Sequence, residues 1–501
     1  MEATAQDRYD ELATLREPYV RTARDCSALT IKALMPPEGH NVHSKLPETY
    51  QDFGSRLVLN LASRLLLALY PPGIVPFSLD VAPEVLMESG QLTPDENVSK
   101  QLALLSKAMN AEIERKVWRK PTFLSLLYLM VTGNVLERMM DDNTLRVYRL
   151  DQYVVVRDLS GNVMEVILKE MVNKANLPED LRGLADKTED VNGRVALYSV
   201  FKKKDEEYEV HQEIGTNKVP DSEYTTDVLP VNPLRWTDVI GEDYGRGKVE
   251  EHLDDLRSVE GLMKGVVDGS AMAARNITMV RPNAAGGLNL RRRLAKAQNG
   301  DVLVGNPEDI SMLKFDNLGS MQFIDSVLNE LKRELASSFL LNSSVQRSGE
   351  RVTAYEIQKM AEELEGALGG TYTMLSADMQ GTRIRRLMLQ MQKQGKLPNV
   401  GEDLIEPTIL TGLESLGREK DIQRVVQAIQ ITQQMPDEGQ MYVKWPSLLT
   451  KVFNGLQLPD SVRDEKEVRQ MMEQRQQQQV AQGLLEEGGR AAIQQATQGA
   501  Q

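Results

Sequence analysis

The stretch VEEHLDDLRSVEGLMKGV, residues 249–266, decides how the rest of the chain is interpreted. Its apolar side chains recur every three or four residues, which places them on one face of a helix, and acidic side chains fill the positions between them. The spacing predicts an amphipathic helix of about 30 residues, much longer than the average of about 11–12, from Tyr244 to near Pro282. The apolar positions are Val249, Leu253, Leu256, Val259, Met263 and Val266.

A second long helix is expected from about Met321 to Leu341, where apolar residues align in the same way. Between the two helices, an Asn-Ala-Ala-Gly-Gly run at residues 283–287 indicates a loop, and residues 301–304 indicate a short strand. Two long helices that bracket a compact insertion are therefore the central feature of the expected fold. The aligned residues of the second helix are Ile324, Val327, Leu331, Leu335 and Phe339.

Towards the N-terminus, periodicity and breakers predict four helices, followed by a region of alternating residues that is typical of strands. This small mixed β region covers residues 145–240 and contains one hairpin around Gly161 and another across residues 202–207. The chain is therefore assigned to a mainly α class with a small mixed β region (α+β). The four helices are expected at residues 8–35, 50–70, 94–117 and 121–131.

Towards the C-terminus, the run from Thr353 to Glu356 has the pattern of a capping box that opens a helix. Gly369 and Gly370 must bend or break that helix, because glycine is poorly suited to a helix interior. It resumes to about Gln394. Further helices are expected at residues 418–434, 440–453 and 461–482, before a Gln-rich tail.

Composition limits the function classes that are open to this chain. It has 501 residues, 41% of them hydrophobic, and a formal net charge of −14. Cys26 is the only cysteine, which excludes intramolecular disulfides and cysteine-rich zinc sites. No apolar stretch approaches the ~20 residues needed to span a bilayer. We expect a soluble protein with no membrane partner.

No stretch of the sequence has the pattern of a catalytic or nucleotide-binding site. A P-loop needs a glycine five residues before its second glycine and a Ser or Thr after its lysine, and the stretch GEDYGRGKV at 241–249 has Glu242 and Val249 there. His40 and His43 lack nearby residues to complete a metal site. No nucleophile motif is present. We expect no enzyme activity, no cofactor and no metal.

Two polar stretches are candidates for binding. The densest basic cluster is Arg291–Arg293, with Arg281 and Lys296 close by. Three interpretations of it stay open: a solvated surface loop, a docking surface for an acidic protein, and contact with DNA phosphates. The other stretch is the loop before the capping box. Its Arg351 lies where a cation is unfavourable to the helix dipole, which favours a functional role.

The sequence resembles the head-to-tail connectors, or portal proteins, of short-tailed, podovirus-type bacteriophages. The most specific segment is LLNSSVQRSGERVTA at residues 340–354, continuing through Glu356-Ile357 and Glu363-Leu-Glu to Leu368-Gly-Gly370. The resemblance covers roughly residues 8–420 in the family's order. Supporting segments are LNLAS (59–63), LAL (67–69), GNV (133–135), Leu150 with YVVVRD (153–158), GNV (161–163), YGR (244–246), LRSVE (256–260), GNPEDIS (305–311), EPT (406–408) and TGLE (411–414).

The resemblance implies a phage portal fold that assembles as a ring of about twelve copies around a channel. The two long helices expected from periodicity agree with the family's order of stem, clip and stem. The implied parts are a wing at 1–244, stem helices at 245–277 and 321–341, a clip at 278–320, a channel loop at 342–352, a long kinked helix from wing to crown at 353–415, a crown at 416–485 and a flexible tail at 486–501.

A portal must pass double-stranded DNA without binding it tightly. DNA carries about one negative charge per 1.7 Å of its axis, so we expect acidic stem residues to line the channel and repel it, while loop arginines form a narrow ring that touches it. The expected channel residues are Glu250, Glu251, Asp254, Arg347, Glu350 and Arg351. The clip residues expected to dock partners are Arg281, Arg291, Arg292, Arg293 and Lys296.

The implied partners are the terminase large subunit, tail adaptor or nozzle proteins, and the major capsid and scaffolding proteins. The implied location is the capsid vertex of the virion, with the host cytoplasm during assembly. There are two rival functions. A ring ATPase or helicase needs a nucleotide loop, which residues 241–249 do not supply. A cytoplasmic helical scaffold or assembly protein without a DNA channel would share the acidic charge and the Gln-rich tail.

Overall fold

A computed structural model describes most of the chain up to Ile409, and this part divides into two compact units. Unit 1 comprises residues 1–67, 117–352 and 363–379, and unit 2 comprises residues 68–116, 353–362 and 380–501. Each is described by itself. The described residues are 4–41, 43–71, 75–82, 96–185, 193–273, 277–280, 287–298, 310–313, 318–341, 354–398 and 405–409, with single residues elsewhere.

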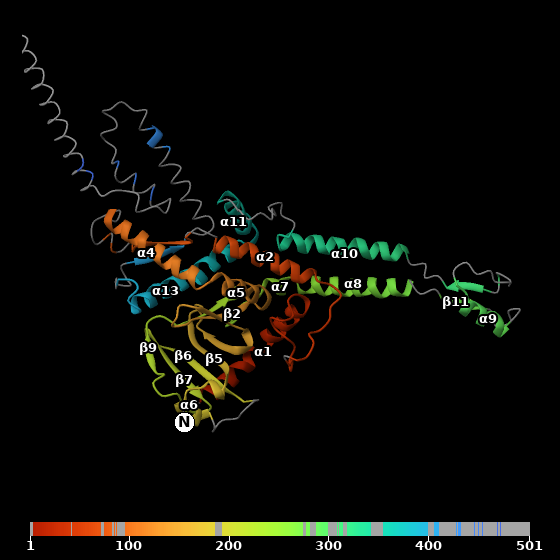
Figure 1. The fold of residues 1–501 in the computed structure, drawn as a ribbon, viewed down its shortest axis with the longest axis horizontal. Helices are drawn as coiled ribbons and strands as arrows, with labels where there is room; N and C mark the ends of the chain where they lie inside the picture. The colour runs from red at the N-terminus through yellow and green to blue at the C-terminus, as the bar shows by residue number, and fades with distance from the viewer. Residues whose placement is uncertain are drawn as a thin grey trace, which may run out of the picture. The chain divides into compact units, whose positions relative to one another are not determined.

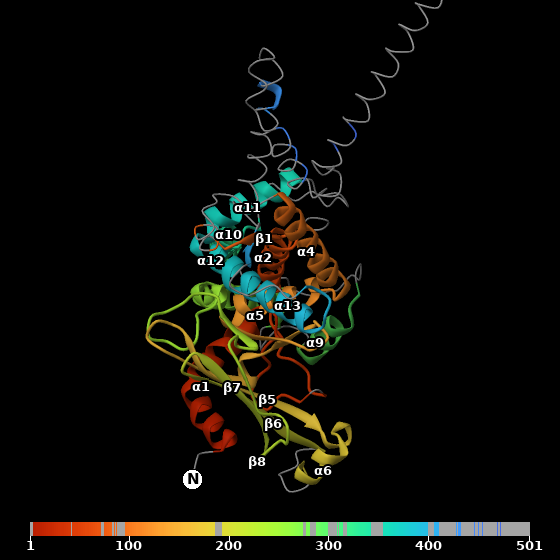
Figure 2. The same cartoon turned by 90° about the vertical axis from the view of Figure 1, so that its left-hand side faces the viewer.

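Unit 1 is built on a six-stranded antiparallel sheet against which α1 (Ala5–Leu29) packs, as Figure 2 shows. α1 begins at a capping box between Thr4 and Asp7. Its Tyr9 is buried against one face of the sheet with Val154 and Tyr198. The strands, in sheet order, are β4 (Tyr153–Arg157), β5 (Val163–Asn173), β6 (Arg194–Lys204), β7 (Glu207–Ile214) and β8 (Asn217–Lys218), and β9 (Tyr224–Thr226) also pairs with β7.

A second sheet, of three antiparallel strands, packs on a different apolar cluster of the larger sheet. Its order is β10 (Val231–Arg235), β2 (Asn134–Met139) and β3 (Leu145–Tyr148). Leu136 and Val231 share a buried cluster with Val166 and Phe201 of the larger sheet and with Val20 of α1. The two sheets and α1 therefore enclose this cluster, which is separate from the cluster around Tyr9.

The mixed β region predicted at residues 145–240 is confirmed, including both hairpins. β4 and β5 join around Gly161, and β6 and β7 join across residues 205–206. The fold class is likewise confirmed, since far more of the described residues lie in helices than in strands. The sequence pattern does not predict β2, because its residues continue the apolar run of α5 (Arg119–Thr132). The other N-terminal helices are confirmed as α1, α2 (Phe53–Leu69) and α4 (Glu96–Arg115).

The long helix predicted from Tyr244 to Pro282 is wrong in two respects. It is interrupted, since α7 (Lys248–Glu251) and α8 (Leu253–Ala273) are separated at His252, whose backbone leaves the helical region (φ −116°, ψ 17°). It also ends early, because Ile277–Val280 form β11, which pairs antiparallel with β12 (Ile310–Leu313). Ile277 and Val280 favour a strand, and packing overrides helical periodicity at His252. The strand expected at 301–304 lies outside the described residues.

The second long helix is confirmed as α10 (Leu318–Ser338), which runs antiparallel to α8 (Figure 1). Near the far end of the pair, Gly269 lies so close to Met321 that an added Cβ would be 2.9 Å from the Met321 side chain. At the other end, the rings of His252 and Phe339 lie 5.5 Å apart. The two helices therefore pack along their length, as predicted for the helices that bracket the insertion.

Burial decreases along this pair of helices as it leaves the sheets. Leu256 and Val259 of α8 are fully buried. Further along, Val267 and Met272 are 45% and 54% exposed, and Phe323 of α10 is 69% exposed. In a single chain, the far half of the pair therefore presents apolar side chains to solvent.

Unit 2 contains a two-stranded antiparallel sheet of β1 (Phe77–Val81) and β13 (Ile405–Ile409), with α4 and α13 (Thr382–Lys393) packed near it. Arg383 of α13 is almost fully buried and donates to the Tyr70 hydroxyl at 3.2 Å.

The helices expected at 418–434, 440–453 and 461–482 lie almost wholly outside the described residues. Among the helices that the structure describes, none has the length and apolar character of a membrane span.

The break predicted at Gly369 and Gly370 is confirmed. α11 (Ala354–Leu368) ends at Gly369, which has a positive φ of 54°. The chain continues as α12 (Gly370–Met374), a π-helical turn at Leu375–Gly381 and then α13. Thr353 of the expected capping box lies outside the described residues.

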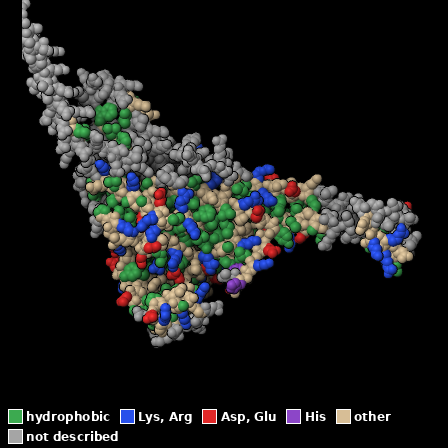
Figure 3. Space-filling view, viewed as in Figure 1, with side chains coloured by type: hydrophobic (Ala, Val, Ile, Leu, Met, Phe, Trp, Pro, Cys, Tyr) green, Lys and Arg blue, Asp and Glu red, His purple; other side chains and the backbone are tan. Residues whose placement is uncertain are grey.

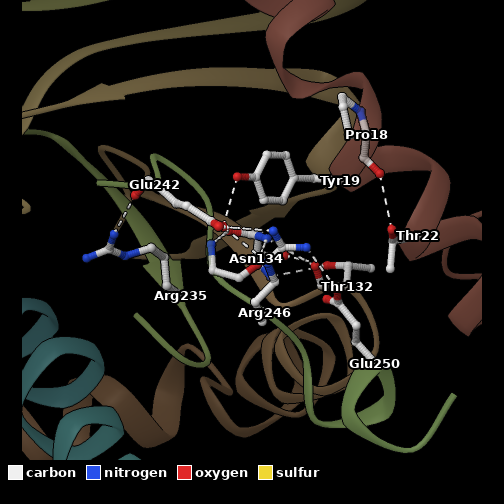
Figure 4. Close-up of polar contacts among 10 residues, drawn as sticks. Pro18, Tyr19, Thr22, Thr132, Asn134, Arg235, Glu242, Arg246 and Glu250 are labelled. Carbon is white, nitrogen blue, oxygen red and sulfur yellow. Dashed lines mark hydrogen bonds and ion pairs between the residues drawn. The ribbon is translucent and has the colours of Figure 1, made fainter. Parts of the chain in front are cut away.

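Glycines allow the loop that leads into α7 to pack directly on the end of α5. Gly133 ends α5 in the left-handed conformation (φ 74°), and a Cβ there would lie 2.6 Å from the Gly245 carbonyl oxygen. A Cβ on Gly247 would lie 2.8 Å from the Met130 carbonyl oxygen. The buried side chain of Asn134 (Figure 4) donates to the Gly245 carbonyl and accepts from its amide, at 2.8 and 2.7 Å. This contact fixes where α7 leaves the sheets.

Replacing Gly133 by Ala is expected to destabilise the protein by about 2–4 kcal/mol, because the new Cβ enters space filled by backbone and the residue must stay left-handed. The measurement is the midpoint of thermal unfolding, which should fall by several degrees. The matched control is Gly241→Ala: Gly241 also has a positive φ, of 81°, but nothing lies within 4 Å of an added Cβ. Equal losses in the two variants would contradict the packing role.

Candidate functional site

Arg246 joins the loop after β10 to the start of α7. Its guanidinium forms ion pairs with Glu242 at 3.0 Å and Glu250 at 2.9 Å, and it lies over the Tyr19 ring, 4.7 Å from the centroid. The Tyr19 hydroxyl donates to Glu242 at 2.9 Å. Figure 4 shows these side chains converging. The hydrogen bonds from Arg246 and then from Tyr19 lower the pKa of Glu242. Glu242 therefore stays charged and, through Arg246 and Tyr19, holds the loop to α1.

The glycines and lysine of residues 241–249 have structural roles in this arrangement. Gly245 and Gly247 allow the backbone contact with α5. The Lys248 amine pairs with Glu251 at 2.7 Å, and the lysine side chain is only 17% exposed. The resemblance of this stretch to a phosphate loop is therefore explained by packing and by a local ion pair.

The three acidic residues expected to line a channel occupy different environments. Glu250 is held by Arg246, and its side chain is 26% exposed. Glu251 is more exposed and pairs with Lys248. Asp254 is 95% exposed and lies 3.1 Å from Arg257, which also pairs with Asp25 of α1 at 2.7 Å. Asp254 is therefore the one of the three that presents its carboxylate most fully to solvent.

His252 marks the break between α7 and α8 and is not singled out by the sequence. Its Nε2 is buried without a hydrogen-bond partner among the described residues. Burial and then the nearby Lys248 lower the pKa of the ring, although Glu251 and Asp255 act in the opposite direction. A neutral ring packs against Phe339, so His252 connects the start of α8 to the end of α10 through an apolar contact.

The arginine cluster lies on a helix and not on the loop that one interpretation supposed. α9 (Gly287–Lys296) carries Arg291, Arg292, Arg293 and Lys296, and all four side chains are exposed. Leu288, near the start of the helix, is 71% exposed. These four cations form no ion pair with any residue that the structure describes. Figure 3 shows the basic side chains gathered over the segment labelled α9 in Figure 1.

Four of the predicted site residues lie outside the described residues. They are Arg281 of the basic cluster and Arg347, Glu350 and Arg351 of the loop between α10 and α11. Their roles stay predictions. The structure does describe both flanks of that loop, the chain after α10 as far as Leu341 and α11 from Ala354.

The histidines expected not to bind a metal are partly described. His40 and His43 lie after α1, where the His40 ring and the Ser44 hydroxyl share a hydrogen bond of 2.8 Å. Within the described part of the chain, no group of three or more His, Cys, Asp or Glu side chains is placed to hold a metal ion. The polar chemistry that the described structure displays is that of ion pairs and an exposed basic helix.

Known proteins similar to this chain are phage connectors. The portal protein of Escherichia phage T7 is 35% identical over 447 residues, covering 85% of this chain and 81% of that protein. The portal protein of Enterobacteria phage T3 is 34% identical over 440 residues, with the same coverage. A solved neck of an empty gene transfer agent particle covers 75% of this chain and 86% of the matched chain, with 12% identity and a TM-score of 0.38, and it adds nothing to the assignment.

The family profile described as bacteriophage head to tail connecting protein matches residues 2–463. That span contains the three-stranded and six-stranded sheets of unit 1. It also contains the helices α8, α9 and α10 and the loop between α10 and α11. It is longer than the span of about 8–420 that the sequence motifs cover. This chain belongs to the family of bacteriophage head to tail connecting proteins.

Proposed function

We propose that the chain is a portal subunit: about twelve copies form a closed ring, and its channel passes double-stranded DNA into the capsid during packaging and out of it during ejection. The observation that carries this proposal is the family match over residues 2–463, together with 35% identity to a portal protein. A closed ring requires heterologous contacts, in which one face of each subunit meets a different face of its neighbour.

The described elements are compatible with the parts that the family resemblance implies. On this proposal, α8 and α10 are the stem, residues 278–320 with α9 are the clip, and residues 342–352 are the channel loop. The elements before α7 belong to the wing at residues 1–244. Residues 353–415 would connect wing and crown, 416–485 would form the crown, and 486–501 would be a flexible tail.

The electrostatic requirement on the channel is that DNA slides and is not held. A protein that neutralises about 6–10 phosphates binds DNA tightly and in a salt-dependent way, so a basic wall would act as a brake. Asp254, Glu251 and Glu250 are proposed to repel the duplex, with Asp254 contributing most because it is the most exposed. Arg347 and Arg351, beside Glu350, are proposed to form the narrow ring that touches DNA.

The remaining partners follow from the same proposal. The clip would dock the terminase large subunit during packaging and then tail adaptor or nozzle proteins, at the head–tail junction of the virion. The wing and crown would meet major capsid and scaffolding proteins during assembly in the host cytoplasm. The portal would hydrolyse no ATP, so the energy for packaging would come from the terminase.

Negative-stain microscopy of the purified full chain tests the central proposal. We expect closed rings with a central hole wide enough for a DNA duplex. A protein that stays monomeric in every buffer, or assembles without a through-going hole, would favour the alternative of a helical scaffold and overturn the proposal.

Reversing the charge of Arg347 and Arg351 to Glu is expected to lower the fraction of filled heads that retain their DNA several-fold, because the loop would then repel phosphates. DNA retention in filled heads is measured after dilution at fixed salt. The control reverses Arg21 and Arg56, which are exposed on α1 and α2 and already pair with nearby acids. Unchanged retention in the loop variant would end the idea of an arginine ring.

Neutralising Arg291, Arg292 and Arg293 to Gln is expected to weaken binding of the terminase large subunit while leaving ring size unchanged, because these side chains are exposed on α9. Binding is measured by pull-down or surface plasmon resonance on assembled rings. The matched control replaces Lys202, Lys203 and Lys204 of β6 by Gln, which removes the same three positive charges from a different surface. Equal binding by the α9 variant and the native ring would disprove docking through α9.

A further inference from the structure

α2 presents two polar side chains, Asn60 and Arg64, one helical turn apart. Residues four apart lie on the same side of a helix, about 6 Å apart along its axis. The Arg64 side chain is only 6% exposed, and Asn60 is partly buried. A charged side chain this deeply buried must be paired to be tolerated, so its partner indicates what α2 holds in place.

Asn60 holds the end of α10. Its side-chain amide donates to the Phe339 carbonyl at 3.2 Å. α10 stops at this point, because Leu340 adopts a left-handed conformation (φ 54°) and the Leu341 amide donates back to the Ala336 carbonyl at 2.7 Å. This is the geometry of a helix C-terminus in which glycine is usual. The last turn of α10 therefore has a defined end, and Asn60 fixes it to α2.

Arg64 holds α11. Its guanidinium donates to the Glu363 carboxylate at 3.1 Å. The adjacent Leu364 is fully buried, so this turn of α11 is also packed. An apolar contact alone would allow α11 to shift along α2, whereas an ion pair with hydrogen-bond geometry has one preferred position.

We infer that α2 fixes the separation between the end of α10 and the turn of α11 at Glu363, which lie on either side of residues 342–353, and that Asn60 and Arg64 are positioning residues for DNA retention. The Phe339 carbonyl that Asn60 holds lies just before this segment. α11, which Arg64 holds through Glu363, begins directly after it. The inference rests on the proposed function, because Arg347 and Arg351 lie in this segment. Neither Asn60 nor Arg64 needs to touch DNA for this role.

The test uses the full chain, in assembled rings and in filled heads. The variants are Arg64→Met, which keeps the apolar stem and removes the charge, and Asn60→Asp, which keeps the shape and removes the donor. We expect rings of native subunit number that retain DNA several-fold less well, with faster hydrogen exchange in peptides covering residues 337–341 and 354–363. The exchanged pair Arg64→Glu with Glu363→Arg should restore retention at least partly, which a general loss of stability would not allow.

The matched control is Arg8→Met. Arg8 and Glu165 also form an ion pair of 3.1 Å in unit 1, but between α1 and β5. This variant should retain DNA normally. If Arg64→Met prevents ring formation, Asn60→Asp decides, and native retention in its intact rings would overturn the inference.

Charge reversal of Arg347 and Arg351 in the same assay separates the two proposals. If that variant loses DNA while intact Arg64→Met and Asn60→Asp rings retain it, the positioning role is wrong and the loop proposal stands. If the loop variant retains DNA, the loop proposal fails, and with it the positioning role for DNA retention.

Discussion

The arrangement of unit 1 depends on the anchoring of α8 at the end where it leaves the sheets. Arg257 pairs with Asp25 of α1, and the Glu260 carboxylate accepts from the Tyr50 amide at 2.8 Å. The glycine contact between the α7 entry and α5 acts just before these bonds along the chain. Three segments that are remote in sequence thus hold one helix, so its direction is fixed although its far half is poorly buried.

The formal charge of −14 overstates how negative the surface at α7 is. Two of the acids expected to repel DNA are paired with Arg246 and Lys248, which reduces the field that a passing polyanion would meet. Both pairs are partly buried, so salt screens them less than it screens fully exposed charges. The cations of α9, by contrast, have no described acidic partner and are concentrated on one helix. The distribution of charge, more than its sum, decides what such a protein binds.

Much of the fold could be predicted from periodicity, because the helices and hairpins bury one side of an amphipathic pattern. The mixed β region and α10 followed directly from such patterns. The break at His252 could not be predicted, since the ring packs against Phe339, which is remote in sequence and follows the end of α10. Nor could the pairing of Glu250 with Arg246, because spacing along a chain does not reveal which acid a guanidinium will select. Arg347 and Glu350 rest on resemblance alone, and Arg351 rests on resemblance and on its unfavourable place before a helix N-terminus.

The apolar side chains that α8 and α10 leave in solvent have a consequence for how the molecule comes into being. Val267, Met272 and Phe323 look like part of a core that one chain does not complete by itself. In the proposed assembly, neighbouring copies would supply the missing contacts. Folding would then be coupled to association, and resistance to heat would increase with the concentration of protein. A freshly synthesised copy would be at its most aggregation-prone in the interval before it meets its neighbours.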